Sequence, residues 1–269
     1  MLVTNDDGIG AAGLHALRRA LAELEGVDVR VIAPHTNRSG TARSITTRSP
    51  IWVEEVEFDD GTLGFATEGT PVDCVRFADL GLLGDKPDLI VSGINHGSNL
   101  GDDVTYSGTV AAAFEGIILG LPAVAVSQQA EIGGMGYAGR QFDFELSANV
   151  AREVVRRLID EPLPIGTLVN INCPAGGASG IELTKLGKRL YDDELKLVEQ
   201  DDDGRRRYRI YGFEPSHEDE DGTDLQAVAD GRISITPIHF DLTDLGGIDR
   251  LGAWDLDELA GSLKLAAAG

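Results

Sequence analysis

The chain has few lysines for its size and a large excess of acidic residues. Only five of its 23 basic residues are lysines, whereas aspartate and glutamate together number 45, and the formal net charge at pH 7 is -22. A charge of this size disfavours a nucleic-acid polymer or an anionic membrane as a partner. Scarce lysine with abundant carboxylate favours a halophilic source, since molar salt screens charges beyond about 3 Å. An ordinary acidic protein is the alternative.

Long apolar runs and paired cysteines are also missing. No stretch of about 18 apolar residues is present, and the first residues carry no basic, apolar leader. We therefore expect a cytoplasmic protein without a membrane span. Cys74 and Cys173 lie far apart in the sequence and show no metal-ligand spacing. Both are expected to be buried thiols rather than a disulfide.

Several common catalytic motifs are absent. The sequence has no GxxxxGK[ST], no GxGxxG after its first expected strand and no GxSxG, which excludes a P-loop and weakens the case for a dinucleotide site or a nucleophile elbow. No two of its five histidines stand at metal-ligand spacing. His15 is expected to be structural. His35 and His96 fall in loops where they could transfer protons.

What is present is a regular alternation of apolar strands and amphipathic helices. Strands are expected at 2–4, 27–33, 88–94, 122–127 and 168–172, and more exposed extended segments at 50–58 and 62–67. Helices are expected between the first two strands and at 71–83, 109–119 and 143–160. This order predicts an α/β fold, a Rossmann-like and mostly parallel sheet with helices on both faces.

The pattern changes after residue 174. Strands are expected at 206–213 and 232–240, in an antiparallel β-hairpin appendage, and a short helix at 249–266. We therefore divide the chain into a catalytic core, 1–175, and a C-terminal extension, 176–269.

Polar loops follow three of the expected strands. They are TNDDG at 4–8, APHTNRSG at 33–40 and NHGSNLGDD at 95–103, and the carboxyl ends of parallel strands meet at one edge of a sheet. Asp6 and Asp7 would repel each other there unless a cation lay between them, and Mg²⁺ or Mn²⁺ accepts carboxylate, amide and hydroxyl oxygens. The alternative is a loop in which one aspartate caps the first helix.

A second loop, YSGTV at 106–110, precedes an alanine-rich helix. Ser107, Gly108 and Thr109 therefore lie at a helix N-terminus, where N–H groups and the helix dipole favour a phosphate. A simple Ser/Thr cap is the alternative.

Five segments in series resemble the SurE family of survival-protein nucleotidases. They are TNDDGI at 4–9, NRSG at 37–40, GTPVDCV at 69–75, VSGINHGSNLGDDVTYSGTVAAAFEG at 91–116 and LPAVAVS at 121–127. The resemblance covers most of residues 1–130 and implies a Rossmann-like core. It also implies homodimers or homotetramers that exchange a C-terminal hairpin. Together with the composition, it indicates a halophilic archaeon as the source.

The resemblance implies a metal-dependent phosphomonoesterase that acts on nucleoside 5'-monophosphates, and possible activity on 3'-monophosphates is left open. The implied ligands of one divalent ion are Asp6, Asp7, Ser39 and Asn95. Asn99 and the amides of Ser107, Gly108 and Thr109 would hold the phosphate. Asp6 or Asp7 would orient a water or attack directly. An exopolyphosphatase acting on short chains and a non-catalytic nucleotide-binding domain are the alternatives.

Overall fold

A computed structural model of the chain describes residues 1–130, 142–191, 194–210 and 216–263. The chain divides into two compact units, Met1–His239 and Phe240–Gly269. No helix among the described residues is long and apolar enough to cross a membrane. The expected tail beyond residue 263, and the part of the expected strand that falls within 211–215, lie outside the described residues.

The first unit is built on a nine-stranded sheet with the order β3-β4-β2-β1-β5-β6-β7-β13-β8. Its central strands are parallel, as the alternation of strands and helices predicts, and they are β4 (Leu63–Thr67), β2 (Arg30–Pro34), β1 (Leu2–Thr4), β5 (Ile90–His96), β6 (Ala123–Gln128) and β7 (Thr167–Cys173). Three further strands complete the sheet: β3 (Val53–Glu57) at one edge, β8 (Ile181–Leu183) at the other, and β13 (Ile233–His239) between β7 and β8.

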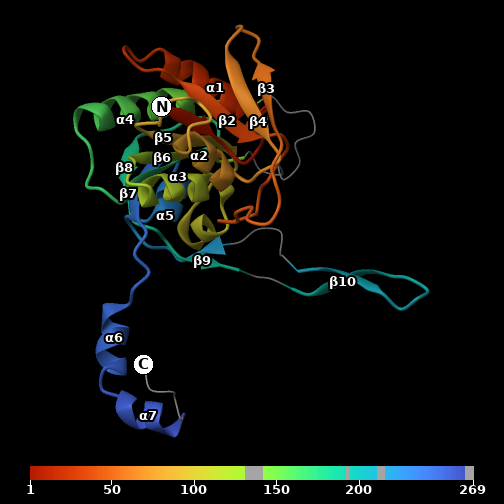
Figure 1. Cartoon of the computed structure of the whole chain (residues 1–269), viewed down its shortest axis with the longest axis vertical. Helices are drawn as coiled ribbons and strands as arrows, with labels where there is room; N and C mark the ends of the chain where they lie inside the picture. The colour runs from red at the N-terminus through yellow and green to blue at the C-terminus, as the bar shows by residue number, and fades with distance from the viewer. Residues whose placement is uncertain (131–141, 192–193, 211–215, 264–269) are drawn as a thin grey trace. The chain divides into compact units, whose positions relative to one another are not determined.

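Helices cover both faces of this sheet (Figure 1). On one face α1 (Ala12–Ala22) and α4 (Glu145–Asp160) enclose a core with Leu14, Leu17 and Val155, and on the other α2 (Pro71–Asp79) packs with α3 (Gly108–Ile118). The central strands are mostly apolar, as expected for parallel strands that are buried on both faces. The expected α/β fold is therefore confirmed.

The close packing of α1 depends on a glycine. An added Cβ at Gly13 would lie 2.1 Å from the carbonyl oxygen of Ile94, so the helix backbone can approach β5 only without a side chain there. The helix thereby rests next to the carboxyl end of β5, which carries Asn95.

The C-terminal segments differ from the expectation in two respects. The strand expected at 232–240 does not belong to a separate appendage, because β13 pairs antiparallel with β7 inside the main sheet. The β8 strand pairs only with residues 233–235, so from Thr236 onward β13 is an edge strand, where Pro237 is tolerated. The tail forms two short helices, α6 (Leu245–Leu251) and α7 (Leu256–Ser262), rather than one.

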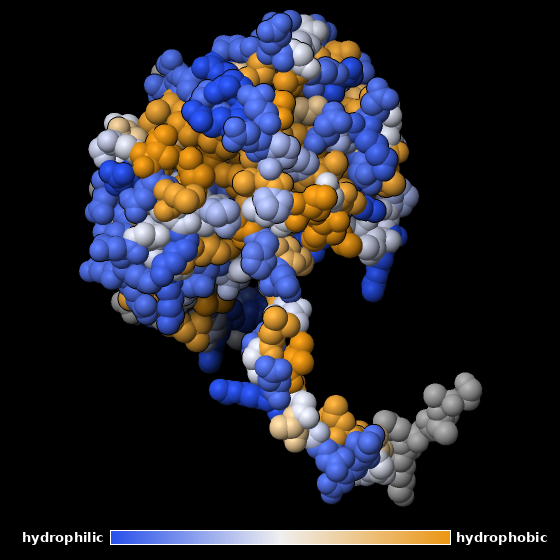
Figure 2. All heavy atoms as spheres, turned by 90° about the vertical axis from the view of Figure 1, so that its left-hand side faces the viewer, coloured by the Kyte–Doolittle hydropathy of each residue, from blue (hydrophilic) through white to orange (hydrophobic). Residues whose placement is uncertain are grey.

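The remaining elements are small. A hairpin of β10 (Lys196–Gln200) and β11 (Arg206–Arg209) forms one two-stranded sheet, and β9 (Arg189–Leu190) pairs with β12 (Ser216–His217) in another. Helix α5 (Asp224–Ala229) packs on β13, and a 3₁₀ helix, η1 (Gly101–Thr105), follows β5. In the second unit, α6 and α7 bury no residue, and their apolar side chains are exposed (Figure 2).

Candidate active site

A polar cleft of about 450 Å³ opens at the carboxyl edge of the parallel strands. Its walls come from the loops after β1, β2 and β5, as expected for a ligand site in an open parallel sheet. The described residues that line it are Asp6, Ser39, Gly40, Asn95, His96, Gly97, Ser98, Asn99, Asp103, Tyr106, Ser107, Ala130 and Phe142. Three of the four predicted metal ligands and two of the predicted phosphate-binding residues are therefore brought together.

Asp6 is the most strongly perturbed carboxylate at this edge. Its side chain is only 3% exposed. Burial, and after it the charge of Asp7, raises the pKa of Asp6 to about 6. The hydroxyl of Thr109, which is fully buried, donates a hydrogen bond to Asp6 Oδ1 and opposes this rise. Two nearby carboxylates with little solvent are the electrostatic setting in which a cation is strongly favoured.

The start of α3 lies unusually close to Asp6. An added Cβ at Gly108 would lie 2.8 Å from Asp6 Cβ and 2.9 Å from Oδ2, so the helix N-terminus can reach the carboxylate only with glycine there. The backbone of Thr109 also hydrogen-bonds to Asp6. The N-terminus predicted to bind phosphate therefore already holds a negative charge, that of Asp6.

Asp7 lies next to the cleft rather than on its wall. Its side chain is 2% exposed, and its Oδ2 accepts a hydrogen bond of 3.0 Å from the backbone N–H of His96. The side-chain amide of Asn37 donates to Oδ1 at 3.1 Å. The carboxylate is thus fixed by two loops that the sequence placed at the same edge, those after β2 and β5.

Asn95 and Ser39 supply the neutral oxygens. Asn95 is 9% exposed, and its Nδ2 donates to the carbonyl of Gly97 at 2.8 Å, which leaves its Oδ1 as the oxygen able to coordinate a cation. Ser39 lies two residues after Asn37, and the Oδ1 of Asn37 accepts a hydrogen bond of 2.9 Å from the N–H of Ser39. This local turn fixes the backbone of the serine.

The predicted phosphate-binding residues have different surroundings. Asn99 and Ser107 line the cleft. Ser107 caps α3 by accepting a hydrogen bond of 3.1 Å from the N–H of Val110. The hydroxyl of Thr109 bonds to Asp6, and Thr109 is not among the residues that line the cleft. The binding of phosphate by Thr109 stays a prediction.

The two histidines predicted at the edge also differ. His96 lines the cleft, with Nδ1 3.5 Å from Asp7 Oδ2 and its ring edge-on to Phe142 and Phe144. His35 lies outside the cleft wall, where Nε2 is 3.3 Å from a carboxylate oxygen of Glu54.

This donor set fits a hard divalent cation. Among the described residues, no three His, Cys, Asp or Glu side chains are arranged to hold a metal ion, so a metal ion here would depend on the aspartate pair with neutral oxygens. Carboxylate, amide and hydroxyl oxygens are what Mg²⁺ and Mn²⁺ accept, whereas Zn²⁺ favours histidine and thiolate. Both cysteines are buried and free, and burial raises the pKa of each thiol, so neither takes part.

Four residues that hold the site in place were not expected from the sequence: Asn37, which binds Asp7, and three buried polar residues, Asn170, Asn172 and Asp224, which bind the loop after β5. His96 was expected at this edge as a residue that could transfer protons, and its backbone N–H also binds Asp7. Asn170 and Asn172 carried a visible signal, because they alternate on one face of an otherwise apolar strand.

The fold and the cleft define a Rossmann-like α/β protein with a candidate hard-cation site at the carboxyl edge of its sheet. A family model described as Survival protein SurE matches residues 1–193. The chain therefore belongs to the SurE family, as its motifs predict.

Its relatives are similar over nearly their whole length. A protein named 5'-nucleotidase SurE from Rubrobacter xylanophilus is 47% identical over 264 residues, which cover 96% of this chain and 98% of the relative. A protein of the same name from Herpetosiphon aurantiacus is 43% identical, with 93% and 96% covered. The crystal structure of the SurE protein from Aquifex aeolicus matches with a TM-score of 0.75 and 37% identity, covering 93% and 98% of the two chains. These organisms are bacteria, and nothing in the comparisons supports an archaeal halophile as the source.

Proposed function

We propose that this protein is a metal-dependent 5'-nucleotidase, which hydrolyses a nucleoside 5'-monophosphate to the nucleoside and inorganic phosphate. The observation that carries the proposal is the buried carboxylate of Asp6, whose pKa is raised to about 6 next to Asp7 in a polar cleft. A site built in this way favours bound positive charge, and a phosphate ester is the substrate that such a charge attracts. The names of the relatives agree with this chemistry.

The cofactor in this proposal is one divalent ion, Mg²⁺ or Mn²⁺. Asp6 and Asp7 would hold it with charged oxygens, and Ser39 and Asn95 with neutral ones. When bound, such an ion supplies charge that stabilises the phosphoryl oxygens and lowers the pKa of a coordinated water.

The remaining steps belong to this chain's own residues. Asn99, which lines the cleft, has one amide N–H bound to Ser127 and a second N–H on the same nitrogen to donate to a phosphate oxygen. Ser107 and the backbone amide of Gly108 would add donors on the α3 side, whereas the backbone amide of Thr109, predicted for the same role, bonds to Asp6. Asp6 or Asp7 would orient the attacking water or attack phosphorus itself. Reduction of an acid-quenched reaction with borohydride distinguishes these routes, because only a phosphoaspartyl group is trapped.

The decisive experiment is release of inorganic phosphate, measured with malachite green over a panel of 5'- and 3'-nucleotides with and without Mg²⁺ or Mn²⁺. We expect release from 5'-monophosphates that depends on the metal and is lost in Asp7→Asn. Nucleotide binding without any release would show a non-catalytic binding domain. Release from short polyphosphate but not from nucleotides would show an exopolyphosphatase.

The proposal extends to assembly and environment. We infer a homodimer or homotetramer in which residues 176–269, including the exposed apolar side chains of α6 and α7, contribute to the interface. Light scattering of the full chain against a variant ending at His239 tests this. We also propose a cytoplasmic enzyme working at high salt, on the basis of the net charge of -22.

A further inference from the structure

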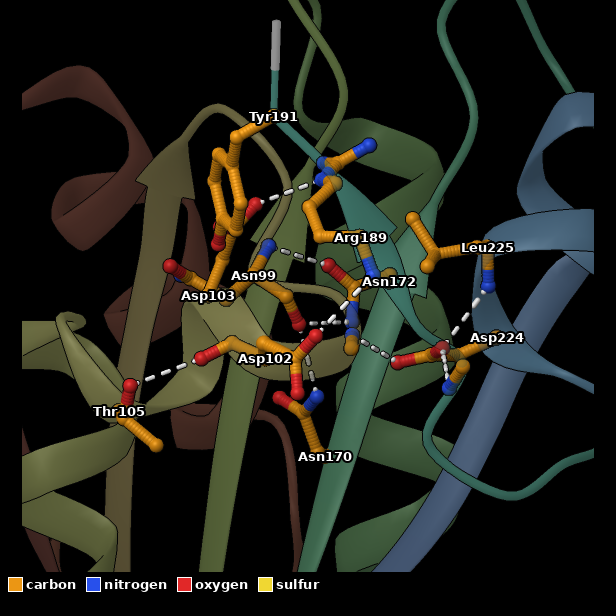
Figure 3. Close-up of polar contacts among 12 residues, drawn as sticks. Asn99, Asp102, Asp103, Thr105, Asn170, Asn172, Arg189, Tyr191, Asp224 and Leu225 are labelled. Carbon is orange, nitrogen blue, oxygen red and sulfur yellow. Dashed lines mark hydrogen bonds and ion pairs between the residues drawn. The ribbon is translucent and has the colours of Figure 1, made fainter. Parts of the chain in front are cut away.

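The loop that follows β5 is bound by side chains from distant parts of the chain (Figure 3). It runs from Asn99, on the wall of the cleft, into η1, and it crosses the carboxyl ends of β6 and β7. Few of the hydrogen bonds that its backbone makes go to other backbone groups. Instead, buried side chains of β7 and α5 accept its N–H groups and donate to its carbonyls.

Asn172 binds both backbone groups of Asn99. Its Oδ1 accepts the Asn99 N–H at 2.8 Å, and its Nδ2 donates to the Asn99 carbonyl at 3.0 Å. Asn170, two residues earlier on the same face of β7, donates to the same carbonyl at 2.9 Å. Both asparagines are fully buried. The oxygen and the nitrogen of the Asn172 amide thus make the two hydrogen bonds that a neighbouring strand would otherwise make to this backbone.

Asp224 binds the loop two residues further on. It is fully buried at the start of α5, and its Oδ2 accepts the N–H of Gly101 at 2.8 Å. Its other oxygen accepts the N–H groups of Gly187 and Leu225, each at 2.8 Å. An added Cβ at Gly101 would lie 2.6 Å from the carbonyl oxygen of Gly187, so the loop is in direct contact with this C-terminal segment.

The far end of the loop is held through a side chain, that of Asp103. Arg189 donates from Nε to Asp103 Oδ2 at 2.8 Å, and the Tyr191 hydroxyl donates to Asp103 Oδ1 at 2.5 Å. Three successive points of the loop, at residues 99, 101 and 103, are therefore fixed by β7, α5 and β9.

We propose that Asn172 and Asp224 are positioning residues for the substrate: they hold the backbone of Asn99 and Gly101 so that the Asn99 amide meets the phosphate in the cleft. This proposal rests on the proposed function, in which Asn99 is a phosphate ligand. It adds that residues beyond the family-like motifs, one of them in the C-terminal third of the chain, set the affinity for substrate. Neither residue lines the cleft, and the polar side-chain atoms of both bond to backbone groups of the protein, so we assign neither a contact with the metal or the substrate.

The proposal predicts a change in the KM for nucleotide without a change in the dissociation constant of Mg²⁺, whereas a general loss of structure would change both. Asn172→Ala leaves the N–H and the carbonyl of Asn99 with fewer partners, so the Asn99 amide should exchange with deuterium faster. The nucleotide KM should rise about tenfold, since a displaced amide loses roughly one hydrogen bond to phosphate. The dissociation constant of Mg²⁺ and kcat should stay within about twofold, because Asp6, Asp7 and Asn95 are held by other contacts.

The experiment measures four quantities for the full chain: the melting temperature, amide exchange over residues 97–104, Mg²⁺ affinity by calorimetry, and KM and kcat with a nucleoside 5'-monophosphate. Asn149→Ala, on α4 away from the loop, is the matched control and should leave all four unchanged. Asp224→Asn tests the second holding point through the Gly101 amide, and it carries the test if Asn172→Ala does not fold. It keeps the size of the side chain and replaces one acceptor oxygen with a donor.

Two results would overturn the proposal. Equal losses of Mg²⁺ affinity and nucleotide affinity would show that these residues support the fold in general. Faster exchange of the loop with an unchanged KM would show that the position of the loop does not matter for substrate. In that second case Asn99→Ala separates the causes: a raised KM leaves the proposed site intact, whereas a wild-type KM removes Asn99 from the proposed function as well.

Discussion

The hydrogen bond from the Thr109 hydroxyl lowers the pKa of Asp6, and the effect of removing this bond can be worked out. Burial is the main cause that raises the pKa of Asp6 to about 6, the charge of Asp7 raises it too, and the hydrogen bond from Thr109 works in the other direction. Thr109→Val keeps the branched shape of the fully buried side chain and removes that bond. The pKa of Asp6 in the metal-free protein must therefore rise further.

The size of the rise follows from ordinary hydrogen-bond energies. A bond to a charged group contributes about 1.5–3 kcal/mol, and about 1.4 kcal/mol corresponds to one pKa unit, so the pKa of Asp6 should reach about 7–8. A cation that binds the carboxylate must then displace a proton, so its affinity is lost as pH falls through this value. The apparent dissociation constant should increase roughly 5- to 50-fold at about pH 6, 2- to 10-fold at about pH 7, and by only about a tenth at about pH 9.

Calorimetric titration with Mg²⁺ at these three pH values tests the reasoning. Ser107→Ala is the control: it removes the cap of α3, in which Ser107 accepts the N–H of Val110, and should lower folding stability by about 1 kcal/mol. It should leave the pH dependence of Mg²⁺ binding unchanged. A loss in Thr109→Val that is the same at all three pH values, or no loss at the lowest, would refute the assignment of Asp6 as a metal ligand tuned by Thr109.

Three further predictions concern the metal, the fold and the charge. Asp7→Asn should lose most phosphate release at limiting Mg²⁺, and Asn95→Ala should lose less because water can replace a neutral ligand; wild-type turnover in Asp7→Asn would contradict the metal site. Gly13→Ala should lower the free energy of unfolding in urea by about 1–3 kcal/mol, since its Cβ would lie 2.1 Å from the Ile94 carbonyl oxygen, whereas Gly10→Ala, with nothing within 4 Å of its Cβ, should change it little. The melting temperature should rise between about 0.05 and 3 M KCl, and Mg²⁺ should partly replace the salt; a flat or falling curve would remove the halophile interpretation.

The order of the parallel core and the place of the site could be read from the sequence. Buried strands separated by amphipathic helices leave few possible topologies, and polar residues directly after such strands must meet at one edge. Asp6, Ser39 and Asn95 lie on one cleft wall although 89 residues separate the first from the last. The family predicted from five short motifs is confirmed over residues 1–193.

Element ends and distant strand partners could not be read in the same way. The helix expected to reach residue 83 ends at Asp79, and one expected terminal helix is two. The polar, acidic sequence before β13 predicts that this strand belongs to an appendage, yet residues 234–239 pair with β7 after a gap of some 60 residues. Loop-closure entropy grows only slowly with the number of intervening residues, so a long acidic insertion does not prevent a strand from returning to the sheet.

The sequence predicts that the helix N-terminus at residues 107–109 binds an anion, but it does not predict which anion. A helix N-terminus favours any anion, and the residues 107–109 alone do not say which one. In the structure the hydroxyl and the backbone of Thr109 bind the carboxylate of Asp6, 103 positions earlier in the chain. A phosphate at this edge would then meet the helix together with two carboxylates rather than a bare row of N–H groups. Without a cation, that combination repels a phosphate, so the affinity for substrate should depend on the metal more steeply than the helix N-terminus by itself would predict. Measuring nucleotide binding to Asp7→Asn by calorimetry with and without Mg²⁺ tests this dependence, and a metal-independent affinity in the wild-type protein would contradict it.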